Sequence, residues 1–86
     1  MLGAKFQLRA YNSGEHIESR IYFITRESYN DITTESYKLL VGFMEDKKKI
    51  YKDKQEILIC ELAIEDDSGS SGAYHWKLLE TLEEEL

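Results

Sequence analysis

The residues with the clearest chemical potential are the two histidines, His16 and His75, and the single cysteine, Cys60. A histidine could serve as a general base or bind a metal, and a cysteine could serve as a nucleophile. Neither histidine has a second histidine at metal-ligand spacing, and the helical His-Glu-x-x-His pattern is absent. Cys60 lies on the apolar side of an alternating segment, where a thiol behaves as a small hydrophobic group. We therefore expect surface histidines, a core cysteine and no enzymatic activity.

Residues 66–72 form the other segment in which a ligand could bind. The segment contains two glycines, but no lysine follows them as in a phosphate-binding loop, and Asp66 and Asp67 would repel phosphate. The two aspartates and Ser68 could offer oxygen atoms to calcium, but the other acids of a calcium loop are missing. The serine and glycine content is typical of a connection between ordered segments. We expect no metal and no cofactor.

The charge of the chain is divided unevenly. The 86 residues carry 11 basic and 17 acidic side chains, a net charge of −6. Residues 1–54 have a net charge of +2, whereas residues 55–86 contain Lys77 against nine acids, a net charge of −8. This acidity opposes the phosphate neutralisation that nucleic-acid binding requires, although the lysines of segment 47–54 leave weak binding through that segment as a third alternative. Direct nucleic-acid binding is therefore not expected.

The chain also lacks the features of a membrane or secreted protein. No apolar run approaches the roughly 20 residues of a membrane span, and residues 1–5 do not resemble the start of a signal peptide. With one cysteine, the chain cannot form an internal disulfide. We expect a cytoplasmic protein that folds as a single domain over residues 1–86.

The first part of the chain has the alternation of a β-hairpin over residues 4–24. Apolar residues alternate in 4–11 and again in 16–24, and 12–15 is a turn sequence. A two-residue loop at Ser13 and Gly14 sets the register that brings both apolar faces together. This register predicts the pairs Ala10–Ile17, Phe6–Ile21 and Arg9–Glu18, with Ile17, Ile21 and Phe23 buried.

The pattern then changes to that of a helix at about 34–48. Thr33 or Thr34 can cap its start, and the lysines near 47–49 suit its last turn. A basic connection at 47–54 follows. Residues 56–65 read as a strand because they alternate and are rich in β-branched residues.

The segment 73–82 is compatible with two structures. As a helix it would align His75, Leu78, Leu79, Leu82 and Leu86, whereas as a strand it would pair with 56–65 in a hairpin over 56–82. The strand is favoured because one register joins the apolar residues and a charge pair. That register predicts the pairs Ile64–Tyr74, Leu62–Trp76, Cys60–Leu78 and Glu61–Lys77, with Trp76 in the core and an acidic tail at 83–86.

Together these elements predict an α+β fold of ββαββ order. Two hairpins are joined by one helix, and the simplest arrangement is a four-stranded antiparallel sheet with the helix packed on one face, in two layers.

Two surfaces are candidates for binding a partner. The first is an acidic surface that presents negative charge as a nucleic-acid backbone does, and it comprises Glu61, Glu65, Asp66, Asp67, Glu80, Glu83, Glu84 and Glu85. The second is the outer face of the first hairpin, with Tyr11, His16 and Tyr22, which is rich in the residue types that interfaces favour.

The sequence therefore favours a protein-binding module. Its small size, acidity and composition look like those of small accessory proteins of phages and mobile elements. The leading hypothesis is an acidic inhibitor of this phage or mobile-element type, which occupies a basic nucleic-acid-handling surface of a host or defence protein. The alternative is a small adaptor or a homo-oligomeric structural protein, such as a homodimer, that uses a sheet edge and the face of Tyr11 and Tyr22.

Overall fold

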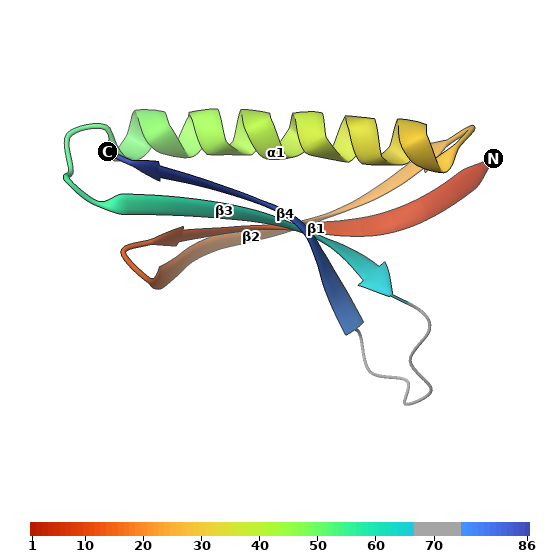
Figure 1. Ribbon diagram of the computed structural model, residues 1–86, viewed down its shortest axis with the longest axis horizontal. Coiled ribbons are helices and arrows are strands. Elements are labelled where there is room, and N and C mark those ends of the chain that lie inside the picture. The colour runs from red at the N-terminus through yellow and green to blue at the C-terminus, as the bar shows by residue number, and fades with distance from the viewer. Residues whose placement is uncertain (67–74) are drawn as a thin grey trace.

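The computed structural model describes residues 1–66 and 75–86, so the predicted connection from Asp67 onward lies outside the described residues. The chain forms β1 (Leu2–Asn12), β2 (Glu15–Arg26), α1 (Tyr29–Tyr51), β3 (Ile57–Asp66) and β4 (His75–Glu85). The strands form one antiparallel sheet in the order β2-β1-β3-β4, and α1 lies across one side of it (Figure 1). The predicted ββαββ order and α+β fold are confirmed.

Helix α1 begins five residues before the predicted start at 34. Ser28 is its N-cap, and the Ser28 hydroxyl accepts a hydrogen bond of 3.2 Å from the backbone N–H of Asp31. Thr33 therefore lies inside the helix, where its hydroxyl donates to the carbonyl of Asn30. The earlier start brings Ile32 into the core at 1% exposure. At the other end, most of the predicted basic connection at 47–54 is helical, because α1 continues to Tyr51.

The first hairpin has the predicted turn but not the predicted register. Ser13 and Gly14 both have positive φ, at 50° and 86°, as a two-residue type I′ turn requires. Beyond the turn, Ile17 is an extra residue in β2, a β-bulge that moves the register by one position. The predicted pairs Ala10–Ile17, Phe6–Ile21 and Arg9–Glu18 are wrong. The observed pairs are Ala10–Glu18, Phe6–Tyr22 and Arg9–Ser19.

The bulge reverses which side of β2 faces α1. Tyr22 and Ile24 now point toward the helix, and the predicted core residues Ile21 and Phe23 are exposed. The reversal is compatible with folding because α1 provides partners for the charged residues of β2 that now face it. Lys47 of α1 pairs with Glu18, and the Arg20 guanidinium lies 5.2 Å from the centre of the Phe43 ring.

The segment 75–85 is a strand, as favoured over the helical alternative, but its register also differs from the prediction. Leu62 pairs with Glu80, Cys60 with Leu82, and Glu65 with Trp76. The predicted pairs Ile64–Tyr74, Leu62–Trp76, Cys60–Leu78 and Glu61–Lys77 are wrong, since Ile64 pairs with Lys77. Tyr74 itself lies outside the described residues. Trp76 is half-buried on the side away from α1, so its predicted place in the core is also wrong. The observed register extends the pairing to Glu83, Glu84 and Glu85, so these residues are part of β4 and not a tail.

Leu79 is an extra residue in β4, so each edge strand of the sheet contains one bulge. The bulge residues Ile17 and Leu79 are both partly buried against the core. Bulges at sheet edges strengthen the local twist. In Figure 1 the turn between β1 and β2, the end of β3 and the start of β4 all curve away from α1.

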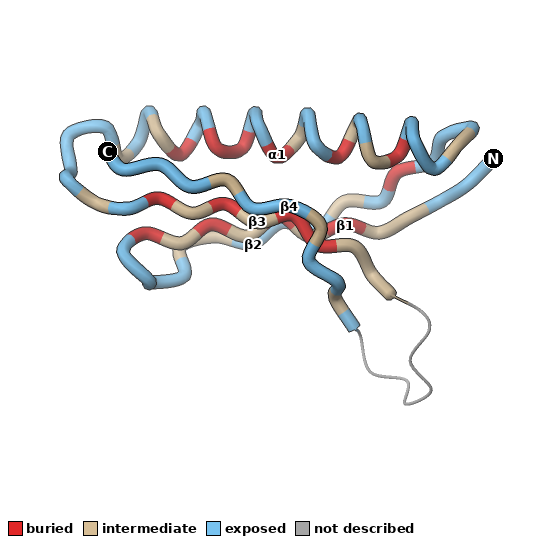
Figure 2. Tube along the Cα trace, in the orientation of Figure 1, coloured by how far each residue is buried: buried red, intermediate tan, exposed pale blue. Residues whose placement is uncertain are grey.

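The core lies between α1 and the sheet. Buried residues alternate along β1 and β3 and recur along the side of α1 that faces them (Figure 2). The side chains with the least exposure are Phe6, Leu8, Ile32, Leu40, Leu58, Cys60 and Ser36. The opposite side of the sheet is not covered by any helix of the described residues. Within residues 1–66 and 75–86, no helix has the length and apolar character needed to cross a membrane.

Candidate functional site

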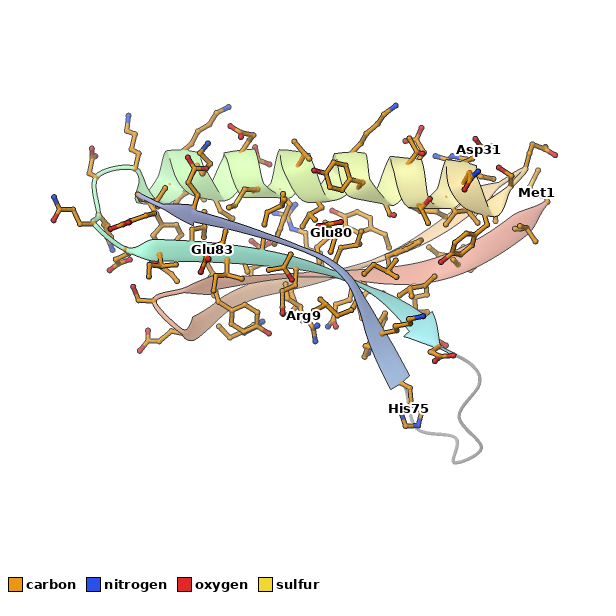
Figure 3. The ribbon with its side chains drawn as sticks, viewed as in Figure 1. Met1, Arg9, Asp31, His75, Glu80 and Glu83 are labelled. Carbon is orange, nitrogen blue, oxygen red and sulfur yellow. The ribbon has the colours of Figure 1, made fainter. Side chains whose placement is uncertain are left out.

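The predicted acidic surface is divided between the two sides of the sheet. Because successive residues of a strand point to opposite sides, β4 places Glu80 and Glu84 on the side of α1 and Glu83 and Glu85 on the other. Figure 3 shows Glu80 on the side of α1, with Arg9 on the far side of the sheet. The predicted glutamates therefore do not form one continuous surface.

Three of the predicted carboxylates pair with cations of the same chain. Glu61 lies 3.3 Å from Arg9 and Glu65 lies 3.5 Å from Lys5. Glu84 lies 2.9 Å from Lys48, and this hydrogen bond raises the pKa of Lys48. These contacts reduce the negative charge that the three glutamates present to a partner.

The remaining predicted acids have different surroundings. Asp66 ends β3 opposite His75, and Asp67 lies outside the described residues. Glu80, Glu83 and Glu85 are exposed on the edge strand β4 and make no ion pair in the part of the chain that the structure describes. These three glutamates are the available part of the predicted acidic surface.

The second predicted surface is also divided. Tyr11 and His16 are paired across β1 and β2 on the side away from α1, with their ring centres 5.6 Å apart in an edge-to-face arrangement. The ring of His16 also lies within 2.6 Å of the Ser19 hydroxyl. Tyr22 is on the opposite side of the sheet and packs against the core. Tyr11 and His16 therefore share a face that Tyr22 does not.

The side of the sheet away from α1, called the open face below, consists of four rows of side chains that cross all four strands. The register of the sheet places one residue from each strand in three of the rows, and in the fourth row, beyond the last β1–β3 pair Phe6–Ile64, the ion pair of Lys5 with Glu65 joins β1 to β3. From β2 to β4, the rows are His16, Tyr11, Ile59 and Glu83; Ser19, Arg9, Glu61 and Thr81; Ile21, Gln7, Ala63 and Leu78; and Phe23, Lys5, Glu65 and Trp76.

Large apolar side chains lie at both edges of the open face. Phe23 is 70% exposed, Ile21 is 59% exposed and Leu78 is 50% exposed. The Phe23 ring passes over Gly3, where an added Cβ would come within 2.8 Å of the ring. Simple alternation along β2 does not predict these exposed residues, because it places Ile21 and Phe23 in the core. Their exposure follows from the two bulges, which simple alternation does not reveal.

The centre of the open face carries charges of both signs in two adjacent columns. Lys5 and Arg9 come from β1, and Glu61 and Glu65 come from β3. Their separations of 3.3 and 3.5 Å are longer than the 2.7–2.9 Å of a strong charge-assisted hydrogen bond. These four side chains are 21–37% exposed, and their net charge is zero.

Cys60 is buried under α1 with no exposed surface. Burial disfavours the thiolate and raises the pKa of the Cys60 thiol from 9.0 to about 11, although the positive charge of Lys47 opposes this effect. A protonated thiol in this position is a poor nucleophile.

The stability of the protein is expected to fall between about pH 9 and pH 11 because of Cys60. In this range the unfolded chain loses the thiol proton and the folded chain keeps it, so the stabilisation is complete below pH 9.0 and is lost as the pH rises through about 11. This pKa difference corresponds to about 2–3 kcal/mol. Urea titrations at about pH 8 and pH 11 measure the loss. Other groups also titrate in this pH range. If Cys60→Ala loses as much stability as the wild type between pH 8 and pH 11, those groups cause the loss and the assignment to Cys60 is wrong.

The described residues contain no group of three or more His, Cys, Asp or Glu side chains that could hold a metal ion. A hollow of about 310 Å³ near the start of β1 has mainly apolar walls, including Leu2, Phe23 and Ile64, and no histidine or cysteine lines it. Comparisons with protein-family models, curated proteins and solved structures found no match to this chain.

Proposed function

We propose that this protein is a non-enzymatic protein-binding module and that its binding surface is the open face. The observation that carries the proposal is the exposure of Phe23, Ile21 and Leu78 on the side of the sheet that α1 leaves uncovered. Phe23 and Ile21 lie on one edge strand and Leu78 lies on the other, and apolar surface exposed on one face of a small protein is typical of an interaction site. Full burial of an exposed side chain of this size contributes about 1.5–3 kcal/mol, and these three side chains, which are 50–70% exposed, would contribute a corresponding part of it.

The other residues of the open face are also suited to protein binding. Tyr11, Trp76 and Arg9 belong to the residue types that are enriched at interfaces. The strands hold them on a rigid support, so little conformational entropy is lost when a partner binds. The open face thus combines apolar edges with a charged centre that can determine which partner fits.

A second candidate function uses the edge strand β4. In this function the protein is the small acidic inhibitor expected from the sequence, of phage or mobile-element type, and it occupies a basic nucleic-acid-handling surface. Glu80, Glu83 and Glu85 favour it because they are exposed along one strand without ion pairs in the described residues. Such charges would act mainly by accelerating association with a basic partner.

Affinity capture from lysate of the native cells, with three altered baits, tests the proposal. Ile21→Ser removes apolar surface from the open face, and Ile50→Ser is the matched control because Ile50 is 64% exposed on α1. We expect Ile21→Ser to reduce the captured partner at least tenfold and Ile50→Ser to leave it unchanged. A loss seen only with Glu80→Gln/Glu83→Gln/Glu85→Gln, and only at low salt, would favour the inhibitor. Full capture by all variants would contradict both functions.

A further inference from the structure

We propose that the partner of the open face is a second copy of this chain, related to the first by a two-fold axis approximately parallel to the strands. This inference deepens the proposed function and rests on it. In such a pair, β2 of one copy lies over β4 of the other, and β1 lies over β3. Each row of the open face then meets the same row of the second copy in reversed order.

The cations of β1 in one copy face the anions of β3 in the other, because the two-fold axis reverses the order of the strands. Arg9 meets Glu61 of the second copy, and Lys5 meets Glu65 of the second copy. Because each contact occurs twice, the four ion pairs within the two chains become part of a larger network of alternating charge. Each of the four side chains is 21–37% exposed on the open face, and this exposed part can contact the second copy.

The outer columns are complementary as well. Phe23 meets Trp76 of the second copy, and Ile21 meets Leu78 of the second copy, so the most exposed apolar side chains cover one another. At the end near the β1–β2 turn, His16 meets Glu83 of the second copy, so an imidazole lies opposite a carboxylate. In all four rows, the side chains of one copy are therefore chemically compatible with the same row of the second copy in reversed order. Binding of an unrelated partner would not require this symmetry.

The charge of the open face also argues against a strongly charged partner. A basic partner would meet Lys5 and Arg9, and an acidic partner would meet Glu61 and Glu65. The second copy presents cations opposite anions and anions opposite cations. The chain as a whole carries −6, but the centre of the proposed interface is neutral, so two copies avoid direct repulsion there.

The size and shape of the open face are adequate for a dimer. With strands about 4.8 Å apart and alternate residues about 6.7 Å apart, four rows of four residues cover roughly 500 Å² of sheet. Two copies together reach the lower bound of about 1,000 Å² for a specific interface. Two sheets of equal twist can stack face to face with their strands within about 30° of each other, as in β-sandwiches.

Sedimentation over a range of concentrations tests the dimer directly. We expect a species of twice 10.1 kDa, together with a blue shift of Trp76 emission as the concentration rises, because Trp76 is half-buried in one chain and covered in the pair. Ile21→Ser should weaken self-association at least tenfold. The matched control Ile50→Ser should dimerise as the wild type does, because Ile50 lies on α1.

Mixing two charge-reversed variants separates contacts between chains from contacts within a chain. Arg9→Glu and Glu61→Arg should each be largely monomeric, because each opposes like charges across the two-fold axis. Their mixture should form a heterodimer, since one chain then presents two carboxylates to two guanidinium groups. The ion pair within each chain stays disrupted in the mixture, so recovery can come only from contacts between chains.

Net charge does not explain the expected recovery. Arg9→Glu changes the net charge from −6 to −8, and Glu61→Arg changes it from −6 to −4, so both variants remain acidic. Lys49→Glu on α1 gives the same −8 and is the matched control. It should not associate with Glu61→Arg. Circular dichroism of every variant should show a folded chain. If Arg9→Glu fails to fold, the double variant Arg9→Gln/Glu61→Gln removes both charges instead, and its self-association should be weaker than that of the wild type.

The outcomes distinguish this inference from the proposed function. A wild-type chain that stays monomeric at several hundred micromolar, or a mixture that associates no better than its components, would overturn the dimer. If the chain is monomeric and Ile21→Ser still loses a captured protein, the open face binds a different partner and the proposed function stands. If Ile21→Ser changes neither self-association nor capture, both are wrong.

Discussion

Phe6→Ala is expected to lower the free energy of unfolding by about 3–5 kcal/mol, whereas Phe23→Ala should lower it by less than about 1 kcal/mol. The same side chain is removed in both variants, and both residues come from the first hairpin. Phe6 is 1% exposed beneath α1, and its removal leaves a cavity. Phe23 is 70% exposed, so its removal costs mainly its contact with Gly3. A loss of 3–5 kcal/mol is a large part of the stability of a domain of this size.

Urea titration followed by circular dichroism measures both changes. The titrations should be made at low chain concentration, so that a contribution of Phe23 to self-association does not enter the comparison. Equal losses in the two variants would mean that Phe23 is buried. In that case β2 would keep the register expected from simple alternation, and the bulge at Ile17 would be wrong.

Glu18→Gln is expected to lower the free energy of unfolding by about 2–3 kcal/mol. Glu18 pairs with Lys47, which is 7% exposed and whose ammonium lies 5.1 Å from the centre of the Phe43 ring. Removal of the carboxylate charge leaves a buried cation without its counter-ion. The loss should be below the 3–5 kcal/mol that breaking a fully buried pair costs, because the Glu18 side chain is 29% exposed.

Two further variants identify the source of this loss. Glu45→Gln removes the same charge from the exposed pair with Lys48, which is 3.4 Å away, and it should cost less than about 0.5 kcal/mol. The double variant Glu18→Leu/Lys47→Met should recover most of the stability lost in Glu18→Gln, because it leaves no buried charge. If the double variant is less stable than Glu18→Gln, the pair stabilises the fold by its attraction and not merely by neutralising Lys47.

The sequence by itself determined the order and type of the elements. Strand β1 could be predicted because Phe6, Leu8 and Ala10 alternate with polar residues, and alternation depends only on neighbours along the chain. The turn at Ser13 and Gly14 was equally readable, since glycine permits the positive φ that such a turn requires. The burial of Cys60 followed from the same local pattern in β3.

The tertiary structure decided the registers, and with them the candidate site. A shift of one residue moves every following side chain to the other side of a sheet, so the bulge at Ile17 exposed Phe23 and turned Glu18 toward α1. The same applies to Trp76, whose place on the open face depends on β4 pairing as far as Glu85. These choices depend on contacts such as that of Glu18 with Lys47, between residues far apart in the chain. Local periodicity contains no information about such contacts, which is why the sequence predicted the strands and only the packed structure placed the open face.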